Sequence, residues 1–176
     1  MSAVEREFLE RSRLYLTGEL LPRIRAAVER LPEDDVWWRP NEASNSVGNL
    51  LLHLSGNVRQ WIVSGVGGDV DDRRRQEEFN AVEGADANAL MDRLTRTVDD
   101  AAAVLSSLPA ERLLESVSVQ GRTVSVLEAI YHCVEHFSMH TGQILYIVKL
   151  RSGEDLGFYE LVDDTPRARW SGHARQ

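Results

Sequence analysis

Four histidines occupy positions from which their side chains could bind a metal ion. His132, His136 and His140 follow one another at four-residue intervals in one helical segment, and His53 lies in another. Residues four apart lie on one face of a helix, so two of the later imidazoles can bind one ion and His53 can supply a third ligand. Three protein ligands leave a position open for water or substrate, as in catalytic zinc sites. The fifth histidine, His173, lies in the tail and is set aside.

The three histidines of the later helix cannot all share one ion. His132 and His140 are about 12 Å apart along the helix axis. The pair is therefore either His132 with His136 or His136 with His140, and the spacing leaves both open. All three point away from the polar face of this helix, which includes Glu135, so we expect them to face the interior of a bundle. We do not expect Glu135 to act as a base. Hydrogen-bonded core histidines without a metal are the alternative interpretation.

His53 belongs to a stripe of small and polar residues, while the apolar residues of its helix lie on another face. This stripe faces either solvent or a cleft against the last helix. In a cleft, Asn49, Asn57 and Gln143 could orient the imidazoles or a bound water. The stripe consists of Ser46, Asn49, His53, Gly56, Asn57 and Gln60.

Apolar periodicity predicts four long helices, at about residues 4–31, 47–66, 87–108 and 126–151. Pro22 should kink or interrupt the first helix. Asn45 or Ser46 is expected to cap the second helix, and Asp86 the third.

The connections are long. We interpret the charged segment 69–85 as a loop. Alternating residues around Gln120-Gly121 indicate a small hairpin of Ser116–Val119 and Arg122–Val124, although Ser125 could instead cap the last helix. We therefore predict an all-α fold, a four-helix bundle with a small β-hairpin before the last helix. Residues 1–160 should form one domain and residues 161–176 a tail whose last ten residues fray.

Composition excludes several classes of function. The chain has 176 residues and a net charge of −8, which argues against a nucleic-acid partner. It has neither a basic amphipathic stretch nor 18 consecutive apolar residues, so we expect no membrane association. The single cysteine, Cys133, and the charged N-terminus predict a reducing, cytoplasmic location. Cys133 is expected to be a buried apolar residue, and Trp37 and Trp38 are expected to anchor the core rather than stack on a ligand.

Two stretches, residues 49–57 (NLLLHLSGN) and 132–144 (HCVEHFSMHTGQI), resemble the signatures of the DinB-like superfamily. The resemblance extends upstream to residues 37–46 and covers the chain to about Tyr159. It implies a four-helix bundle that commonly forms a homodimer. It also implies a divalent ion, often zinc or nickel, held by His53, His136 and His140. His132 would then be a neighbouring polar group or a hydrogen-bonded core residue.

The same resemblance suggests what the site does. Characterised members of the superfamily include transferases that join low-molecular-weight thiols to electrophiles, and thiol-dependent isomerases. Our leading hypothesis is a metal-dependent thiol S-transferase acting on small-molecule electrophiles, with metal-activated water as a hydrolytic variant. The alternative is a dimeric module that binds a metal or ligand without catalysis, in which Cys133 could be a fourth ligand. A metal or pH sensor is a third, weaker option.

Overall fold

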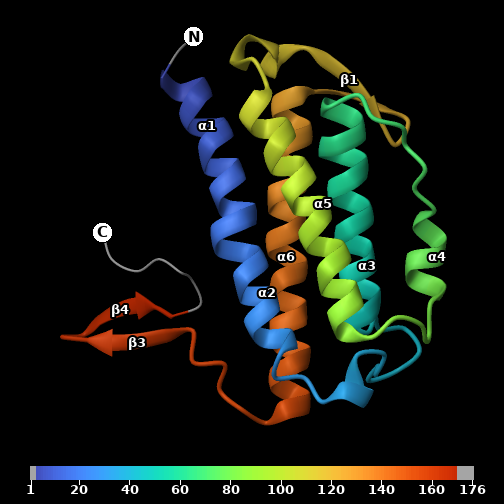
Figure 1. Ribbon diagram of the computed structural model, residues 1–176, viewed down its shortest axis with the longest axis vertical. Coiled ribbons are helices and arrows are strands. Elements are labelled where there is room, and N and C mark those ends of the chain that lie inside the picture. The colour runs from blue at the N-terminus through green and yellow to red at the C-terminus, as the bar shows by residue number, and fades with distance from the viewer. Residues whose placement is uncertain (1–2, 170–176) are drawn as a thin grey trace.

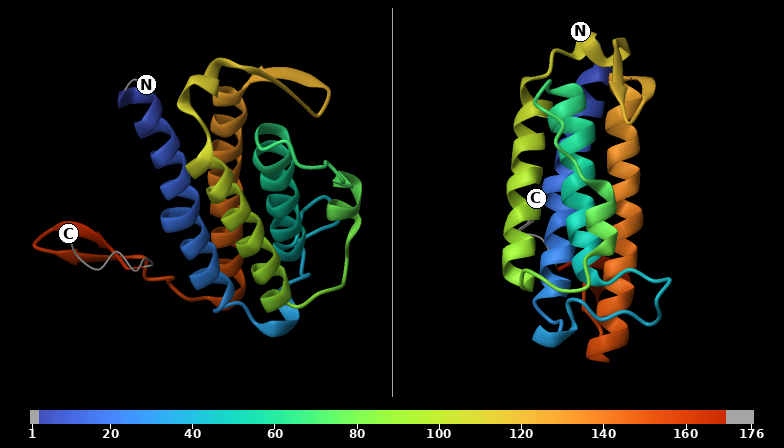
Figure 2. Two further views of the ribbon diagram at one scale, coloured as in Figure 1. Left: turned by 45° about the horizontal axis from the view of Figure 1, so that its top comes forward. Right: turned by 90° about the vertical axis from the view of Figure 1, so that its right-hand side faces the viewer.

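A bundle of four long helices makes up most of the computed structural model, which describes residues 3–169 (Figures 1 and 2). The first rod consists of α1 (Ala3–Leu14), the π-helical turn η1 (Tyr15–Leu20) and α2 (Leu21–Val28). The second is α3 (Val47–Val58), continued by the π-helical η3 (Arg59–Val66). The others are α5 (Ala87–Ser107) and α6 (Val126–Ser152). The predicted all-α fold with long connections is confirmed.

The core lies along the axis of this bundle. The first rod and α3 each pack against both α5 and α6. Every helix contributes large side chains that are fully buried, and each such side chain stabilises the fold by about 1.5–3 kcal/mol. They include Leu16, Ile24, Leu51, Leu54, Leu94, Ile130 and Phe137.

Side-chain caps fix the starts of α3, α5 and α6. Ser46 accepts a hydrogen bond from the backbone of Asn49, whose side chain accepts one from the backbone of Ser46. Ser125 and Glu128 form the same reciprocal box at α6, and Asp86 caps α5. Of the two residues expected to cap α3, Asn45 and Ser46, it is therefore Ser46 that does so. Ser125 both ends the hairpin and caps α6, so the two interpretations of this residue hold together.

Pro22 does not stop the first rod. It lies in the first turn of α2, and the rod continues through it although Pro22 has no N–H to donate. The hydrogen-bonding pattern changes just before it, in the π-helical η1. The predicted break is therefore a local change of helix type.

The connection between the second and third long helices travels the length of the bundle. α3 and α5 run in the same direction, so the chain returns along the outside of α3 before α5 begins (Figure 1). The prediction of a plain loop at 69–85 is wrong here, because residues Arg75–Asn80 form a short helix, α4, packed on α3. Six residues are too few for a periodic apolar stripe, and the packing against α3 stabilises the helix instead.

Two antiparallel hairpins complete the structure. β1 (Ser116–Val119) and β2 (Arg122–Ser125) form the predicted hairpin, with Gln120 and Gly121 both at positive φ in its turn. β3 (Tyr159–Val162) pairs with β4 (Thr165–Ala168) in a second hairpin, which extends away from the bundle (Figure 2). This unpredicted hairpin spans the boundary expected after residue 160.

The remaining elements are short. η2 (Glu33–Asp35) and η4 (Ala110–Leu114) are single 3-10 turns in the connections. The predicted fraying falls mainly on residues 170–176, which lie outside the described residues, as does His173. None of the helices described here is long and apolar enough to span a bilayer.

Candidate metal centre

Three imidazoles from two antiparallel helices converge on one point. His53 comes from α3, and His136 and His140 come from successive turns of α6. The Nε2 atom of His136 lies 3.0 Å from that of His53 and 3.1 Å from that of His140. One nitrogen from each ring lies within 4.8 Å of the other two. His53 and His140 are buried and His136 is half-buried, so the group lies inside the bundle.

Hydrogen bonds at the opposite ring nitrogens fix the tautomers of two of these histidines. The Nδ1–H of His53 donates to Glu78 Oε2 at 2.8 Å, and the Nδ1–H of His140 donates to Gln143 Oε1 at 2.7 Å. The Gln143 oxygen can only accept, so the His140 proton lies on Nδ1. The His53 Nδ1 also lies 3.1 Å from Arg73 Nη2, which can only donate. Because this Nη2 already donates to Glu78 and the carboxylate oxygen is closer to the ring, we assign the His53 proton to Nδ1 as well. Both Nε2 atoms therefore direct a lone pair toward the common point.

This arrangement cannot be fully satisfied by hydrogen bonds alone. The Nε2 of His136 is within hydrogen-bond distance of two lone pairs but can carry one proton, so it can donate to only one of them. A cation at the common point would be bound by all three nitrogens at once. Imidazole suits zinc, nickel and copper, and an acceptor behind each Nδ1–H is the usual second layer of such sites. The described residues therefore fit a divalent transition metal.

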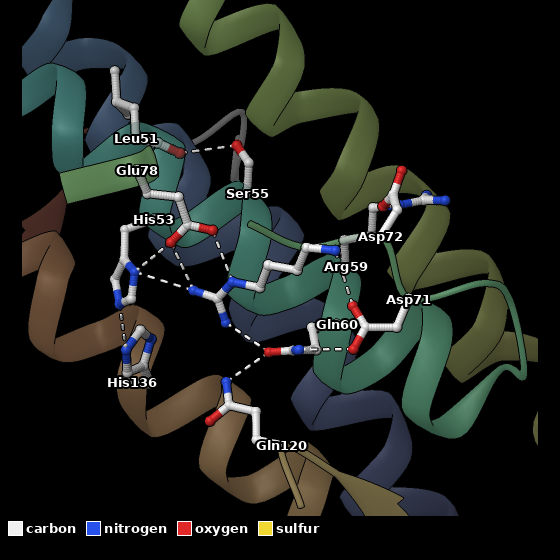
Figure 3. Close-up of polar contacts among 11 residues, drawn as sticks. Leu51, His53, Ser55, Arg59, Gln60, Asp71, Asp72, Glu78, Gln120 and His136 are labelled. Carbon is white, nitrogen blue, oxygen red and sulfur yellow. Dashed lines mark hydrogen bonds and ion pairs between the residues drawn. The ribbon is translucent and has the colours of Figure 1, made fainter. Parts of the chain in front are cut away.

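Behind His53 lies a buried ion pair that the sequence analysis missed. Arg73 donates to both carboxylate oxygens of Glu78, from Nε at 2.7 Å and from Nη2 at 2.8 Å. Both side chains are less than a tenth exposed. Arg73 also donates to Gln60 Oε1 at 2.9 Å, which links the pair to η3. Figure 3 labels His53, Glu78 and Gln60, which belong to the same network of polar contacts. The pair contributes no net charge, and both partners reach the Nδ1 of His53, Glu78 Oε2 at 2.8 Å and Arg73 Nη2 at 3.1 Å.

A glycine makes room for this pair. A Cβ atom at Gly56 would lie 2.0 Å from Glu78 Oε1 and 2.9 Å from Arg73 Nε. Only a residue without a side chain therefore lets α4 deliver the carboxylate to His53. Gly56 was part of the small and polar stripe in the sequence, but its partners were not identifiable because they come from the segment interpreted as a loop. The one signal there was Phe79, an aromatic residue in a charged run, whose ring lies 4.6 Å from that of His53.

Burial keeps the imidazoles of His136 and His140 neutral. Desolvation, followed by the neighbouring His140 and His53, lowers the pKa of His136 to about 3. Desolvation also lowers the pKa of His140, although the hydrogen bond to Gln143 opposes it. For Glu78, burial alone would raise the pKa, but the hydrogen bonds from Arg73 and His53 outweigh it and the pKa is lowered. Near neutral pH His136 and His140 are thus neutral, and the Glu78 carboxylate is ionised.

Of the three residues expected to orient the imidazoles, only Gln143 has a hydrogen bond to one of them. Gln143 contacts His140 directly. Asn49 contacts none of the three imidazoles. Its side-chain amide instead donates to the carbonyl oxygens of Glu78 and Ala81, at 2.8 and 2.7 Å, and so holds the α4 segment in place. Asn57 is buried, and its Oδ1 has no hydrogen-bond partner.

His132 lies outside the converging group. Its ring packs on Trp61, with 4.3 Å between ring centroids, and is 5.5 Å from the ring of His136. Of the two pairs that spacing left open, the structure brings His136 and His140 together with His53. Cys133 is fully buried and is not part of the group.

The tryptophans at 37 and 38 serve the packing of the loop between the first two rods. Trp37 lies against Gly48 and donates from Nε1 to the carbonyl of Ala85. Trp38 carries the Arg151 guanidinium over its ring at 4.5 Å. Glu135 is exposed, as its place on the polar face predicted.

Two solved structures share this fold. A DinB-like protein from Bacillus subtilis is 19% identical with a TM-score of 0.62, and the match covers 82% of this chain and 93% of that one. A conserved protein from Enterococcus faecalis is 18% identical, also with a TM-score of 0.62, over 88% and 99% of the two chains. No curated protein sequence matches the chain. The fold is therefore that of a DinB-like protein, as the signature stretches suggested.

The family comparison agrees with this fold. The model of a family described as "Protein of unknown function (DUF1572)" matches residues 4–161, which include all four long helices and the three converging histidines. The match covers far more than half of the chain. We conclude that this protein belongs to the DUF1572 family and has the DinB-like fold.

Proposed function

We propose that this protein is a divalent-metal-dependent enzyme, a thiol S-transferase that acts on small electrophiles. The observation that supports it best is the convergence of three Nε2 atoms, with the protons of His53 and His140 held on the opposite nitrogen. Three protein ligands leave at least one coordination position for an exogenous group, whereas a structural zinc site is closed by four.

A bound divalent ion would lower the pKa of a coordinated thiol and so supply a thiolate near neutral pH. The residues of the chain hold the three imidazoles in place: Glu78 fixes His53, and Gln143 fixes His140. In the proposed reaction a sulfur–carbon bond forms to the electrophile, the bond to its leaving group breaks, and the thiol proton passes to solvent.

The nucleophile must come from a second molecule. Cys133 is the only cysteine of the chain, its side chain is fully buried, and burial raises its pKa to about 12. It cannot supply a thiolate at neutral pH. A small thiol, or water in the hydrolytic variant, would fill this role.

A cavity of about 360 Å³ is lined by Gln143, the residue that holds His140, although none of the three imidazoles lines it. Trp38, Leu50, Tyr146 and Leu150 also line it. Its volume is in the range of small-molecule sites. Aromatic and aliphatic walls with the polar side chains of Ser44, Asn45 and Gln143 suit a small, largely apolar electrophile.

The test begins with metal content. Protein purified without a histidine tag is analysed for metals, then stripped and reloaded with zinc or nickel, and thiol consumption is followed with a panel of thiols and an alkyl-halide electrophile. We expect one ion per chain and metal-dependent thiol consumption, both lost in His136→Ala and retained in His132→Gln. Stoichiometric metal without turnover would favour a binding module, release of a hydrolytic product would favour the hydrolase variant, and no stoichiometric ion would refute the proposal.

A further inference from the structure

The third imidazole lacks the support that the other two have. His53 has Glu78 behind its Nδ1 and His140 has Gln143, but the Nδ1 of His136 is buried without a hydrogen-bond partner. The Oδ1 of Asn57 also lacks a hydrogen-bond partner, and this residue is only 3% exposed. Buried polar atoms are almost always partnered by protein or ordered water, so two such atoms in one region call for an explanation.

The packing of α3 against α6 places these two residues at the same level. His53 meets His136 across the interface. Two turns later in the chain, Trp61 of η3 meets His132, which lies one turn before His136 on the antiparallel α6. Asn57 lies one turn after His53 and one turn before Trp61. Its amide therefore falls between these two contacts, at the turn of α6 that carries His136.

We propose that Asn57 is the positioning residue of His136, its side-chain amide bonding the Nδ1 of that ring directly or through one bridging water. The inference concerns the same three-histidine group as the proposed function, and its first readout needs no metal. An amide can accept from a ring N–H or donate to a bare ring nitrogen, so Asn57 can serve either tautomer.

The two tautomers correspond to two states of the centre. Without metal, the Nε2 of His136 faces two lone pairs and carries the proton, so its Nδ1 accepts from the Asn57 amide N–H. With metal, Nε2 must be bare, the proton moves to Nδ1, and Asn57 Oδ1 accepts it. Glutamate could not partner the first state, which explains an amide here where His53 has a carboxylate.

The test is nitrogen-15 NMR of the histidine rings in metal-free protein, whose chemical shifts report the tautomer. We expect His136 in the Nε2–H form in the wild type. In Asn57→Asp, which can only accept, His136 should change to the Nδ1–H form, whereas in Asn57→Leu it should keep the Nε2–H form. His53 and His140 should stay in the Nδ1–H form in all three. Ser55→Ala is the matched control, since Ser55 is equally buried on the same helix but bonds the Leu51 carbonyl.

Zinc affinity provides the second readout. Asn57→Leu should weaken zinc binding about 10- to 100-fold, the usual effect of losing such a partner. Asn57→Asp should restore it, which a merely structural role would not predict. Asn57→Ser, a smaller hydroxyl partner, replaces the Asp variant if the buried carboxylate prevents folding, and should bind zinc more tightly than Asn57→Leu.

Unchanged His136 shifts in Asn57→Asp, together with wild-type zinc affinity in Asn57→Leu, would overturn the inference. If the wild type bound no zinc, the proposed function would fail, while the tautomer experiment would still decide the role of Asn57.

Discussion

A histidine binds a metal only through a nitrogen without a proton, so the partner of the opposite nitrogen decides whether the ring is ready. Here the Nδ1–H groups of His53 and His140 are held by Glu78 and Gln143. The rings are therefore already oriented in the folded chain, and metal binding need not supply the free energy to orient them. Arg73 matters for the same reason, because without it the Glu78 carboxylate would be a buried, uncompensated charge.

Gly56→Ala tests whether this support depends on close approach. The new methyl group would overlap Glu78 Oε1, so the ion pair must move away from His53. We expect a loss of about 1–3 kcal/mol of stability and weaker zinc binding, measured by denaturant unfolding and by calorimetric titration. Gly142→Ala is the control on α6, where a Cβ meets nothing within 4 Å. It should gain about 0.5–1 kcal/mol from helix propensity and bind zinc normally. Equal zinc affinity in the two variants would contradict the role given to Gly56.

Cys133 provides a test of the residue-level chemistry that is independent of metal. Because burial raises its pKa to about 12 and leaves it without solvent contact, the native protein should not react with Ellman's reagent at pH 8. In guanidinium chloride one thiol per chain should react. Rapid modification of the folded protein would show that the thiol is accessible and would reopen its role as nucleophile or ligand.

At the scale of elements, the short helix α4 is as important for the candidate centre as the two long helices. α3 and α6 place the imidazoles, but α4 carries Glu78, and Arg73 precedes it in the same connection. Asn49 ties this segment down through the carbonyl oxygens of Glu78 and Ala81.

Asn49→Ala should therefore loosen α4 more than the bundle. The carbonyl groups of Glu78 and Ala81 lose their donor, at a cost of roughly 1–3 kcal/mol. We expect faster amide hydrogen exchange at residues 75–81, measured by mass spectrometry, with little change in the core of α5. Uniformly faster exchange throughout the bundle would show instead that Asn49 only supports global stability.

The long helices and their caps could be predicted because apolar periodicity and the cap residues at Ser46, Asp86 and Ser125 are local signals. α4 and Arg73–Glu78 could not, since a six-residue helix without a stripe depends on tertiary contacts to α3. The β3–β4 hairpin was missed although its turn, Asp163-Asp164, has both residues at positive φ, a conformation that aspartate tolerates. The histidine spacing predicted that imidazoles could share an ion but left two pairs open. The resemblance to the DinB-like signatures chose His136 and His140, and these are the two that converge with His53 in the fold.

For the whole molecule, burying neutral histidines makes stability depend on pH. The pKa values of His136 and His140 are lower in the folded chain than the ordinary 6.5. Between these values the unfolded chain binds more protons, so the metal-free protein should lose stability as pH falls from about 6.5 toward about 3. Glu78, whose pKa is also lowered, adds to this loss below about 4.5.

Urea unfolding of EDTA-treated protein at pH 7.5, 6.5 and 5.5 measures this dependence. We expect a progressive decrease below pH 6.5, and a shallower one in His136→Phe, which removes the most strongly shifted group. Identical pH dependence in the two proteins would contradict neutral burial of His136. Metal present at 100 times its Kd should raise the stability of the wild type by about 2.7 kcal/mol and that of the variant by much less.

X-ray absorption spectroscopy of the stoichiometric zinc complex shows whether His53, His136 and His140 bind one ion together. The account predicts three imidazole nitrogens at about 2.0–2.1 Å, with the remaining coordination filled by a light atom that an added thiol replaces with sulfur at about 2.3 Å. Two or fewer imidazoles, or a sulfur ligand before any thiol is added, would contradict it.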